Sequence, residues 1–252
     1  MIPNARLDAE IILAHTLNKP RTWIHAHGDE ELDARRCDIA DARAQLRLER
    51  VPVAYIIGHK EFYGRRFRVT PDTLIPRPES EALITLAKKY AVDARHAIDV
   101  GTGSGCLGIT LALELPKLSI TLSDTSKRAL QVAEQNAKTY STNVRLLQSD
   151  LLDDYPLRAD LIVANLPYVD TSWTENSPDL VHEPASALYA AEHGLGLIKQ
   201  LLVQAPAKLS PNGVLLLEAD RRQHEEIIKD AVAHHLEHLE TDGLALAFRI
   251  QG

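Results

Sequence analysis

Cysteine is scarce in this chain of 252 residues, which contains only Cys37 and Cys106. Neither has a CxxC partner or a spacing typical of metal ligands, so the sequence predicts no disulfide and no metal site. Apolar runs of about 18 residues, which a membrane-spanning helix requires, are missing, and so is a signal-peptide pattern. We therefore expect a cytoplasmic protein in a reducing compartment.

An excess of basic residues is missing too. The chain has 28 Lys and Arg against 35 Asp and Glu, which gives a formal net charge of −7. Proteins that bind nucleic-acid duplexes usually carry a strongly basic surface, so this balance argues against stable nucleic-acid binding. Long repeats and low-complexity segments are also absent. The length suits one large domain, or one domain with a smaller appendage.

The first 78 residues predict two small structural regions. Apolar residues recur at helical spacing in 5–17, 22–27 and 31–50, so we expect residues 1–50 to form a helical N-terminal domain. Residues 51–78 differ, because aromatic and β-branched residues flank Gly64 and indicate a hairpin within a linker. Pro78 then stands near the start of a helix predicted over 79–91.

The rest of the chain, 79–252, alternates between strand and helix patterns. Strands are predicted at 96–100, 119–124, 143–147, 160–164, 213–219, 237–241 and 244–250, and helices at 105–115, 126–139, 193–209 and 223–236. This alternation predicts an α/β fold with a mostly parallel sheet covered on both faces. Asp242-Gly243 joins the last two strands and is a hairpin signal, so we expect an antiparallel strand at one edge.

A glycine-rich loop, Gly101-Thr102-Gly103-Ser104-Gly105, stands between the first of these strands and its helix. Glycines let a ligand approach the backbone closely, and the helix N-terminus favours a carboxylate or phosphate. The spacing is GxGxG, and no Gly-Lys-Ser/Thr follows, which argues against a P-loop.

Two acidic residues mark the ends of the next two strands: the first ends its strand, and the second follows its strand. Asp124 lies roughly 20 positions after Gly101, the spacing expected of a carboxylate that binds a ribose. Asp150 precedes Leu151 after the third strand. Each acid alone could be a helix cap, but their joint placement at successive strand ends, with the glycine loop, indicates a ligand that contains adenosine.

The tetrapeptide Asn165-Leu166-Pro167-Tyr168 follows a buried strand. The side-chain oxygen of Asn165 and the carbonyl of Leu166 are hydrogen-bond acceptors, and Pro167 and Tyr168 supply a flat wall. Such a site suits a planar amino or amide nitrogen. Hydride transfer has no use for these acceptors, whereas methyl transfer to nitrogen does, which favours S-adenosylmethionine over NAD as the cofactor.

These motifs resemble those of class I S-adenosylmethionine-dependent methyltransferases, which carry an Asn-Pro-Pro-Tyr-like tetrapeptide. The segments Glu61-Phe62-Tyr63-Gly64, Pro76-Arg77-Pro78-Glu79 and Glu183-Pro184 further resemble those of the release factor glutamine methyltransferases, the PrmC/HemK family. The chain departs from that family at Leu166, which stands where the second position is usually Pro, and at Ala219, near which the usual glycine is missing.

The resemblance implies a Rossmann-like domain with a seven-stranded, mostly parallel sheet behind a helical domain that recognises the substrate. It implies methyl transfer to the N5 amide nitrogen of the glutamine in the Gly-Gly-Gln motif of class 1 peptide chain release factors, which modifies translation termination. The release factor would be the partner of a monomeric enzyme.

The same resemblance implies roles for individual residues. Those implied to bind the cofactor are Asp99, Gly101, Thr102, Gly103, Ser104, Gly105, Asp124, Asp150, Leu151 and Asn165. The implied catalytic residues are Asn165, Leu166, Pro167 and Tyr168, and the substrate would also contact Arg77, Glu79, Glu183 and Pro184.

Two other functions remain open from the sequence. The tetrapeptide also resembles that of rRNA adenine dimethyltransferases, and N6-adenine methylation of RNA or DNA would use the same acceptors, with the base stacked on Tyr168. The acidic balance and the Pro-Arg-Pro-Glu segment favour the protein substrate. A binding module without catalysis is the other alternative, against which the intact Asn165, Pro167 and Tyr168 argue.

Overall fold

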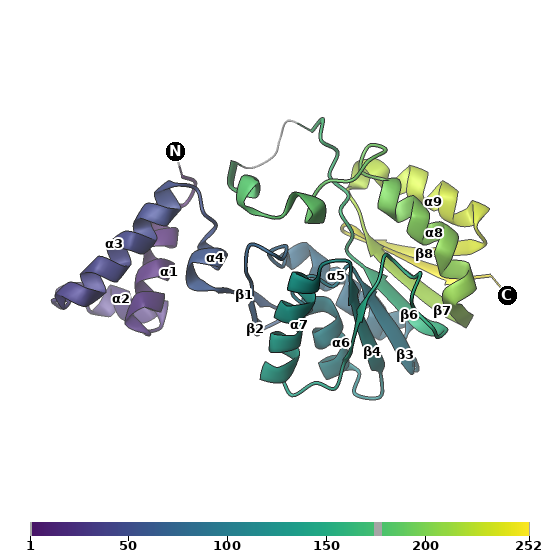
Figure 1. Cartoon of the computed structure of the whole chain (residues 1–252), viewed down its shortest axis with the longest axis horizontal. Coiled ribbons are helices and arrows are strands. Elements are labelled where there is room, and N and C mark those ends of the chain that lie inside the picture. Colours follow the sequence, from purple (N-terminus) through teal and green to yellow (C-terminus); the bar gives the residue numbers. More distant parts are fainter. Residues whose placement is uncertain (1, 174–177, 252) are drawn as a thin grey trace. The chain divides into compact units, whose positions relative to one another are not determined.

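The computed structural model describes residues 2–173 and 178–251 and divides into two compact units (Figure 1). Of the described residues, the first unit contains 2–59 and 178–182, and the second contains 60–173 and 183–251. The first unit is therefore discontinuous in sequence. Among the helices described, none is long and apolar enough to cross a membrane.

Helices build the first unit, as the sequence predicts. They are α1 (Ala5–Leu17), α2 (Arg21–Ala26), α3 (Ala34–Leu48), α4 (Val53–Ile57) and the 3-10 turn η2 (Pro178–His182). The Asp33 carboxylate caps α3 by accepting a hydrogen bond from the Arg36 amide at 2.9 Å. The sequence analysis did not assign α4, which begins after Pro52 and ends at Gly58 in a left-handed conformation.

An ion-pair network joins the distant segment η2 to the helices of the first unit. Arg47 on α3 is buried, and its guanidinium contacts Asp8 on α1 and Asp179 on η2, each at 2.8 Å. The ring nitrogen Nε2 of His182 also lies 3.0 Å from the carbonyl of Glu49. These contacts explain why residues 178–182 belong to the helical unit.

The second unit begins at Lys60, within a hairpin of β1 (His59–Phe62) and β2 (Arg65–Arg68). Tyr63 and Gly64 form its turn with positive φ angles of 50° and 71°, which confirms the hairpin predicted around Gly64. Phe62 and Phe67 anchor it in the core, where their rings meet edge to face at 6.3 Å.

The second unit then alternates between helices and strands along the sequence. Its further elements are the 3-10 turn η1 (Pro78–Ser80), α5 (Glu81–Tyr90), β3 (His96–Val100), α6 (Cys106–Glu114), β4 (Ser119–Asp124), α7 (Lys127–Thr139), β5 (Arg145–Gln148), β6 (Ala159–Ala164), η3 (Ala185–Ala187), α8 (Gly196–Lys208), β7 (Leu209–Glu218), η4 (Arg221–Gln223), α9 (His224–Ala233), β8 (Leu236–Asp242) and β9 (Ala245–Ile250).

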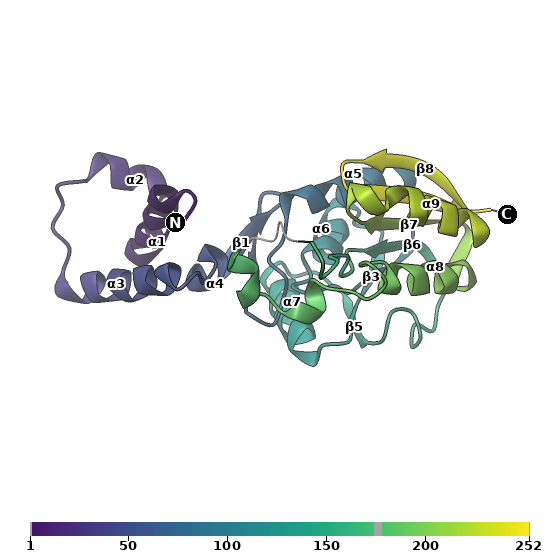
Figure 2. The same cartoon turned by 90° about the horizontal axis from the view of Figure 1, so that it is seen from above.

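The sheet has seven strands in the order β5-β4-β3-β6-β7-β9-β8. The pairs from β5 to β7 are all parallel, whereas β9 is antiparallel to both of its neighbours. This confirms the predicted α/β fold and its antiparallel pairing at one edge. The antiparallel strand itself is β9, and β8 forms the outermost strand of that edge (Figure 2).

Both faces of the sheet are buried, which the apolar strands require. Along β6, Leu161 and Val163 pack in one core with residues of α5, α6 and α7, while Ile162 and Ala164 pack in a second core with residues of α8 and α9. Successive side chains of a strand point to opposite faces. Helices on both sides therefore hold the strands rigidly, and the loops at their ends project from a fixed scaffold.

Candidate active site

A cavity of about 720 Å³ opens at the carboxyl ends of the central strands, which is a typical volume for a small-molecule site. The order of the strands explains its position. Val100, the last residue of β3, pairs with Ser123 on β4 and with Ala164 on β6. The segments that follow these three strands therefore emerge together at one edge of the sheet, where open α/β sheets bind ligands.

The glycine loop forms one wall of the cavity. Gly101, Gly103 and Gly105 have φ angles of 70°, 54° and 81°, which other residues rarely adopt. A Cβ atom at Gly101 would lie 3.0 Å from Cδ2 of Leu166, and one at Gly105 would lie 2.8 Å from Cδ1 of Ile109. Glycine therefore sets both the shape of this loop and its close approach to the tetrapeptide.

Asp99, on β3, holds the glycine loop through hydrogen bonds. Its Oδ2 accepts hydrogen bonds from the Thr102 hydroxyl at 2.6 Å and from the Gly108 amide at 2.9 Å. The side chain is fully buried, and this burial raises the pKa of Asp99 to about 6. Among the described residues, Oδ1 has no hydrogen-bond partner.

Asp124 lines the cavity, and its side chain accepts hydrogen bonds from two backbone amides. Its two carboxylate oxygens accept hydrogen bonds from the amides of Gly103 at 2.9 Å and Ser126 at 2.8 Å. Burial raises the pKa of Asp124, and these backbone hydrogen bonds oppose the shift. Each carboxylate oxygen has a second lone pair, which a ligand hydroxyl could use.

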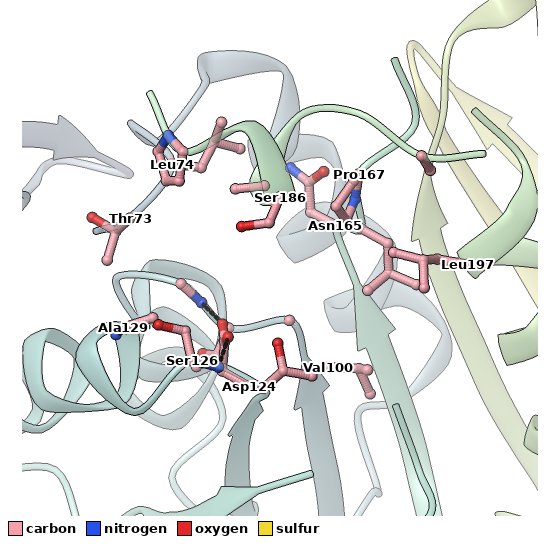
Figure 3. Close-up of a pocket in the computed structure, with 18 of the residues that line it drawn as sticks. Thr73, Leu74, Val100, Asp124, Ser126, Ala129, Asn165, Pro167, Ser186 and Leu197 are labelled. Carbon is pink, nitrogen blue, oxygen red and sulfur yellow. Dashed lines mark hydrogen bonds between the residues drawn. The ribbon is translucent and has the colours of Figure 1, made fainter. Parts of the chain in front are cut away.

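The tetrapeptide lies across the cavity from Asp124 and Ser126 (Figure 3). Asn165 Nδ2 donates a hydrogen bond to the Ser80 hydroxyl at 2.9 Å. Because the nitrogen end of the amide is engaged in this way, its oxygen end is left as an acceptor for a ligand. Leu166 is buried against Gly101, and Pro167 lines the cavity.

Tyr168 is held behind the cavity. Its hydroxyl donates a hydrogen bond to Oε1 of Glu218 at 3.2 Å, and burial, followed by the charge of Glu218, raises the pKa of Tyr168. Its carbonyl accepts a hydrogen bond from Gln223 Nε2 at 2.9 Å. A Cβ atom at Gly194 would lie 2.0 Å from that carbonyl, so only glycine fits there.

Arg77 and Glu183 are paired beside the cavity. Glu183 is buried and accepts hydrogen bonds from the Ile75 amide at 2.9 Å and from the Arg77 guanidinium at 2.5 Å. Arg77 and Pro184 line the cavity, whereas Glu183 is not among the lining residues. The carboxylate thus fixes the linker before η1 and restricts the arginine.

The structure brings most of the predicted site residues together. Those that line the cavity are Arg77, Gly101, Thr102, Gly103, Ser104, Asp124, Asp150, Leu151, Asn165, Leu166, Pro167 and Pro184. All predicted site residues are described, and those outside the lining are Glu79, Asp99, Gly105, Tyr168 and Glu183. Of the expected flat wall, Pro167 alone borders the cavity.

Sequence reasoning missed two residues whose side chains hydrogen-bond the side chains of the tetrapeptide. Ser80 accepts the hydrogen bond from Asn165, and Glu218 accepts the one from Tyr168. Glu218 carried a usable signal, because an acidic residue at the end of a buried parallel strand is the feature that identified Asp124. Ser80 carried none, since a serine early in a helix is usually a capping residue.

Comparison with known proteins defines the class first. The Methyltransferase small domain family matches residues 79–246. The fold is similar to that of a methyltransferase from Pyrococcus furiosus, with a TM-score of 0.60 and 18% identity over 81% of this chain and 98% of that one. It is also similar to a ribosomal protein L11 methylase from Lactobacillus delbrueckii, with a TM-score of 0.55 and 21% identity over 76% and 88%. The chain has the fold of a class I methyltransferase.

The family follows from closer relatives. The PrmC N-terminal domain family matches residues 1–58. Release factor glutamine methyltransferase of Koribacter versatilis is 39% identical over 222 residues, which cover 86% of this chain and 79% of that protein. The Haemophilus influenzae protein of the same name is 34% identical over 254 residues, which cover 94% and 87%. This chain belongs to the release factor glutamine methyltransferase family, which confirms the resemblance seen in its sequence.

Proposed function

We propose that this protein transfers a methyl group from S-adenosylmethionine to the side-chain amide nitrogen of a glutamine. The acceptor is the glutamine of the Gly-Gly-Gln motif in class 1 peptide chain release factors. The observation that carries this proposal is the amide of Asn165, a residue that lines the cavity: its nitrogen is bound to Ser80, and its oxygen has no hydrogen-bond partner among the described residues. Relatives that cover most of the chain carry the name of this activity.

The residues of the cavity fit the cofactor. Gly101 and Gly103 present bare backbone to the cavity, which suits the methionine end, and the Asp124 carboxylate suits the ribose hydroxyls. Asp150 and Leu151 line the part assigned to the adenine. When bound, this cofactor supplies an electrophilic methyl group on a sulfonium sulfur.

The tetrapeptide orients the substrate nitrogen. The lone pair of an amide nitrogen is delocalised, so the nitrogen is a weak nucleophile. The side-chain oxygen of Asn165 and the carbonyl of Leu166 accept hydrogen bonds from its two N–H groups and stabilise the positive charge that develops during transfer. Pro167 borders the amide plane, and the proton released after transfer passes to water. Arg77 and Pro184 line the path of the substrate loop. Glu183 holds Arg77, and the exposed Glu79 meets the substrate outside the cavity.

In this proposal the predicted helical domain, residues 1–50, which lies within the first unit, recognises the release factor. The linker 51–78 connects it to the catalytic residues 79–252. We place the reaction in the cytoplasm, where release factors act. A monomer suffices, because one copy of the second unit contains the whole cavity.

Methyl transfer from labelled S-adenosylmethionine to a purified class 1 release factor tests the proposal. A Gly-Gly-Gln→Gly-Gly-Ala variant of the factor and total RNA serve as parallel acceptors. Label in the wild-type factor alone is the expected result. Label in RNA alone would overturn the proposal in favour of adenine methylation, and cofactor binding without label in any acceptor would favour a module without catalysis.

A further inference from the structure

A buried carboxylate behind the tetrapeptide has no part in the proposed chemistry. Glu218 is the last residue of β7, the strand next to β6, and its exposed fraction is 1%. Its Oε1 accepts the hydrogen bond from Tyr168, and its Oε2 is buried without a regular hydrogen bond among the described residues. Burying an acidic side chain costs free energy unless hydrogen bonds or an opposite charge compensate it. The burial of Glu218 therefore points to a role for this side chain.

Ser80 connects this carboxylate with Asn165. Ser80 is also buried, and its hydroxyl accepts the hydrogen bond from Asn165 Nδ2. The carboxyl of Glu218 also interacts with this hydroxyl: burial raises the pKa of Glu218, while hydrogen bonding from Ser80, Tyr168 and Asn165 lowers it. Asn165, Ser80, Tyr168 and Glu218 therefore lie together in one polar cluster, in which Asn165 binds Ser80 and Tyr168 binds Glu218.

The chemistry of these groups decides which of them donates and which accepts in each hydrogen bond. A carboxylate only accepts hydrogen bonds, and a serine hydroxyl has a single hydrogen to donate. Ser80 accepts from the nitrogen of Asn165, so its single hydrogen remains available for the carboxylate of Glu218, which can only accept. The oxygen of the amide then faces the other way, as an acceptor for the substrate.

We propose that Glu218 is a positioning residue that, through Ser80, keeps the Asn165 amide in the orientation that presents its oxygen to the substrate nitrogen. This inference rests on the proposed function for the identity of the substrate. Glu218 also accepts a hydrogen bond from Tyr168, which connects the same carboxylate to the last residue of the tetrapeptide. Glu218 touches neither substrate nor cofactor and acts only through these neighbours.

Replacement of Glu218 by glutamine tests whether the carboxylate fixes the donor and the acceptor in the hydrogen bond between Asn165 and Ser80. Glu218→Gln keeps the shape and can still accept from Tyr168, but its amide can also donate to Ser80. The serine can then donate to Asn165, and the Asn165 amide can turn its nitrogen toward the substrate. We expect kcat to fall about 100-fold, the scale of a misoriented reacting group, with the cofactor Kd and the melting temperature unchanged. Ser80→Ala should have a similar effect.

A double-mutant cycle separates positioning from a general structural role. If Glu218 acts through Asn165, Glu218→Gln should cause no further loss of kcat when it is added to Asn165→Ala. Losses that multiply in the double variant would overturn the inference, and so would unchanged kcat in both Glu218→Gln and Ser80→Ala.

Nuclear magnetic resonance provides a readout that does not depend on activity. The two side-chain amide protons of Asn165, assigned by their loss in Asn165→Ala, should exchange slowly with water in the wild type and at least about tenfold faster in Glu218→Gln. Equal exchange rates in the two proteins would overturn the inference even if the wild type methylates release factors. Faster exchange in the variant together with an unlabelled release factor would uphold the positioning and reject the proposed substrate.

Discussion

Asn165 is the residue on which the proposed chemistry depends most directly. Its nitrogen is engaged by Ser80, so its oxygen is the one polar end of the amide left to face a substrate. The hydrogen-bond partners of Asn165 lie within the second unit, and Asn165 itself belongs to the lining of the cavity. A substitution there should therefore act on the transfer step and spare the binding of the cofactor.

Asn165→Ala should lower the rate of methyl transfer about 10²- to 10³-fold, the effect of removing one preorganised group that stabilises developing charge. The cofactor Kd should stay within a factor of about two, because Asp124 and the glycine loop are unchanged. Label transfer and isothermal calorimetry measure the two quantities. Asn143→Ala, at an exposed position after α7, is the matched control and should change neither. Wild-type turnover by Asn165→Ala would contradict the assigned role.

Asp99 should make the stability of the protein depend on pH. Its pKa rises from 3.8 to about 6 on folding because of burial, so the folded protein favours the protonated acid. The stabilisation is complete below about pH 4 and is lost as the pH rises through about 6. The loss is about 3 kcal/mol for a shift of this size.

The isosteric variant Asp99→Asn removes that titration. Its free energy of unfolding relative to the wild type should rise by about 3 kcal/mol between pH 4 and pH 7, as measured by urea denaturation at each pH. Thr102→Val, which removes one hydrogen bond to Asp99 but leaves the carboxyl, is the control and should keep the titration. A constant difference between Asp99→Asn and the wild type would show that Asp99 does not titrate in this range.

At the scale of elements, the end of β6 is held by segments that come later in the chain. The tetrapeptide ends at Tyr168. The carbonyl of Tyr168 is bound by Gln223 of η4 and covered by Gly194, which precedes α8. Gln223 also binds the carbonyl of His193 at 2.9 Å. The α8 and η4 segments thus fix the turn that carries Asn165 and Leu166, and damage to them should be transmitted to the site.

Gly194→Ala should destabilise the protein by about 3 kcal/mol or more, since a methyl group there meets a carbonyl and the backbone is left-handed. Methyl transfer should fall as well, because Tyr168 has to move. Gly243→Ala is the matched control, for its φ angle is also positive at 63°, but no heavy atom of the described residues lies within 4 Å of the added carbon. It should cost about 1–2 kcal/mol. Equal costs in chemical denaturation would show that backbone strain alone matters at Gly194.

Elements were predictable from the sequence where the signal is local. The strands that end at Val100, Asp124 and Ala164 were correct to the last residue, since buried apolar runs and following turn residues mark both ends. Strand β7 begins at Leu209, earlier than the predicted 213, because Pro211 and Asn212 give no strand signal. The α4 helix was missed for a similar reason, as its five residues are too few to show a helical period.

The site was predictable in part for the same reason. Gly101 and Asn165 follow a strand and Asp124 ends one, so the topology of a parallel sheet brings them together. Glu218 also ends a parallel strand and could have been assigned in this way, whereas Ser80 could not, because its role depends on a hydrogen bond to a residue far away in the sequence. Tyr168 was expected beside the ligand, yet a buried carboxylate engages its hydroxyl behind the cavity.

At the scale of the whole molecule, the helical unit depends on a distant segment of the chain. Arg47 is buried between Asp8 and Asp179, and the attraction between these charges offsets the loss of their hydration. Because the segment 178–182 lies between the tetrapeptide and Glu183, the helical unit and the residues proposed to receive the substrate are linked through the chain itself.

Arg47→Met should release η2 from the helices, because Asp179 loses its buried partner. Amide hydrogen exchange in 178–182 should become at least about tenfold faster, which mass spectrometry of peptides from this segment measures. Arg36→Met is the matched control on the same helix, since Arg36 pairs with Asp33 at the surface and should leave this exchange unchanged. Equal exchange in Arg47→Met and the wild type would show that other contacts hold the segment.

The discontinuous helical unit has a consequence for how the protein is made. Chains usually fold from the N-terminus as they leave the ribosome, and α1 to α4 emerge first. Their central arginine, however, faces Asp8 alone until Asp179 has left the ribosome. By then the strands β3 to β6 and the glycine loop have already emerged. The unit that appears first is therefore completed late, after most of the cofactor cavity has been translated.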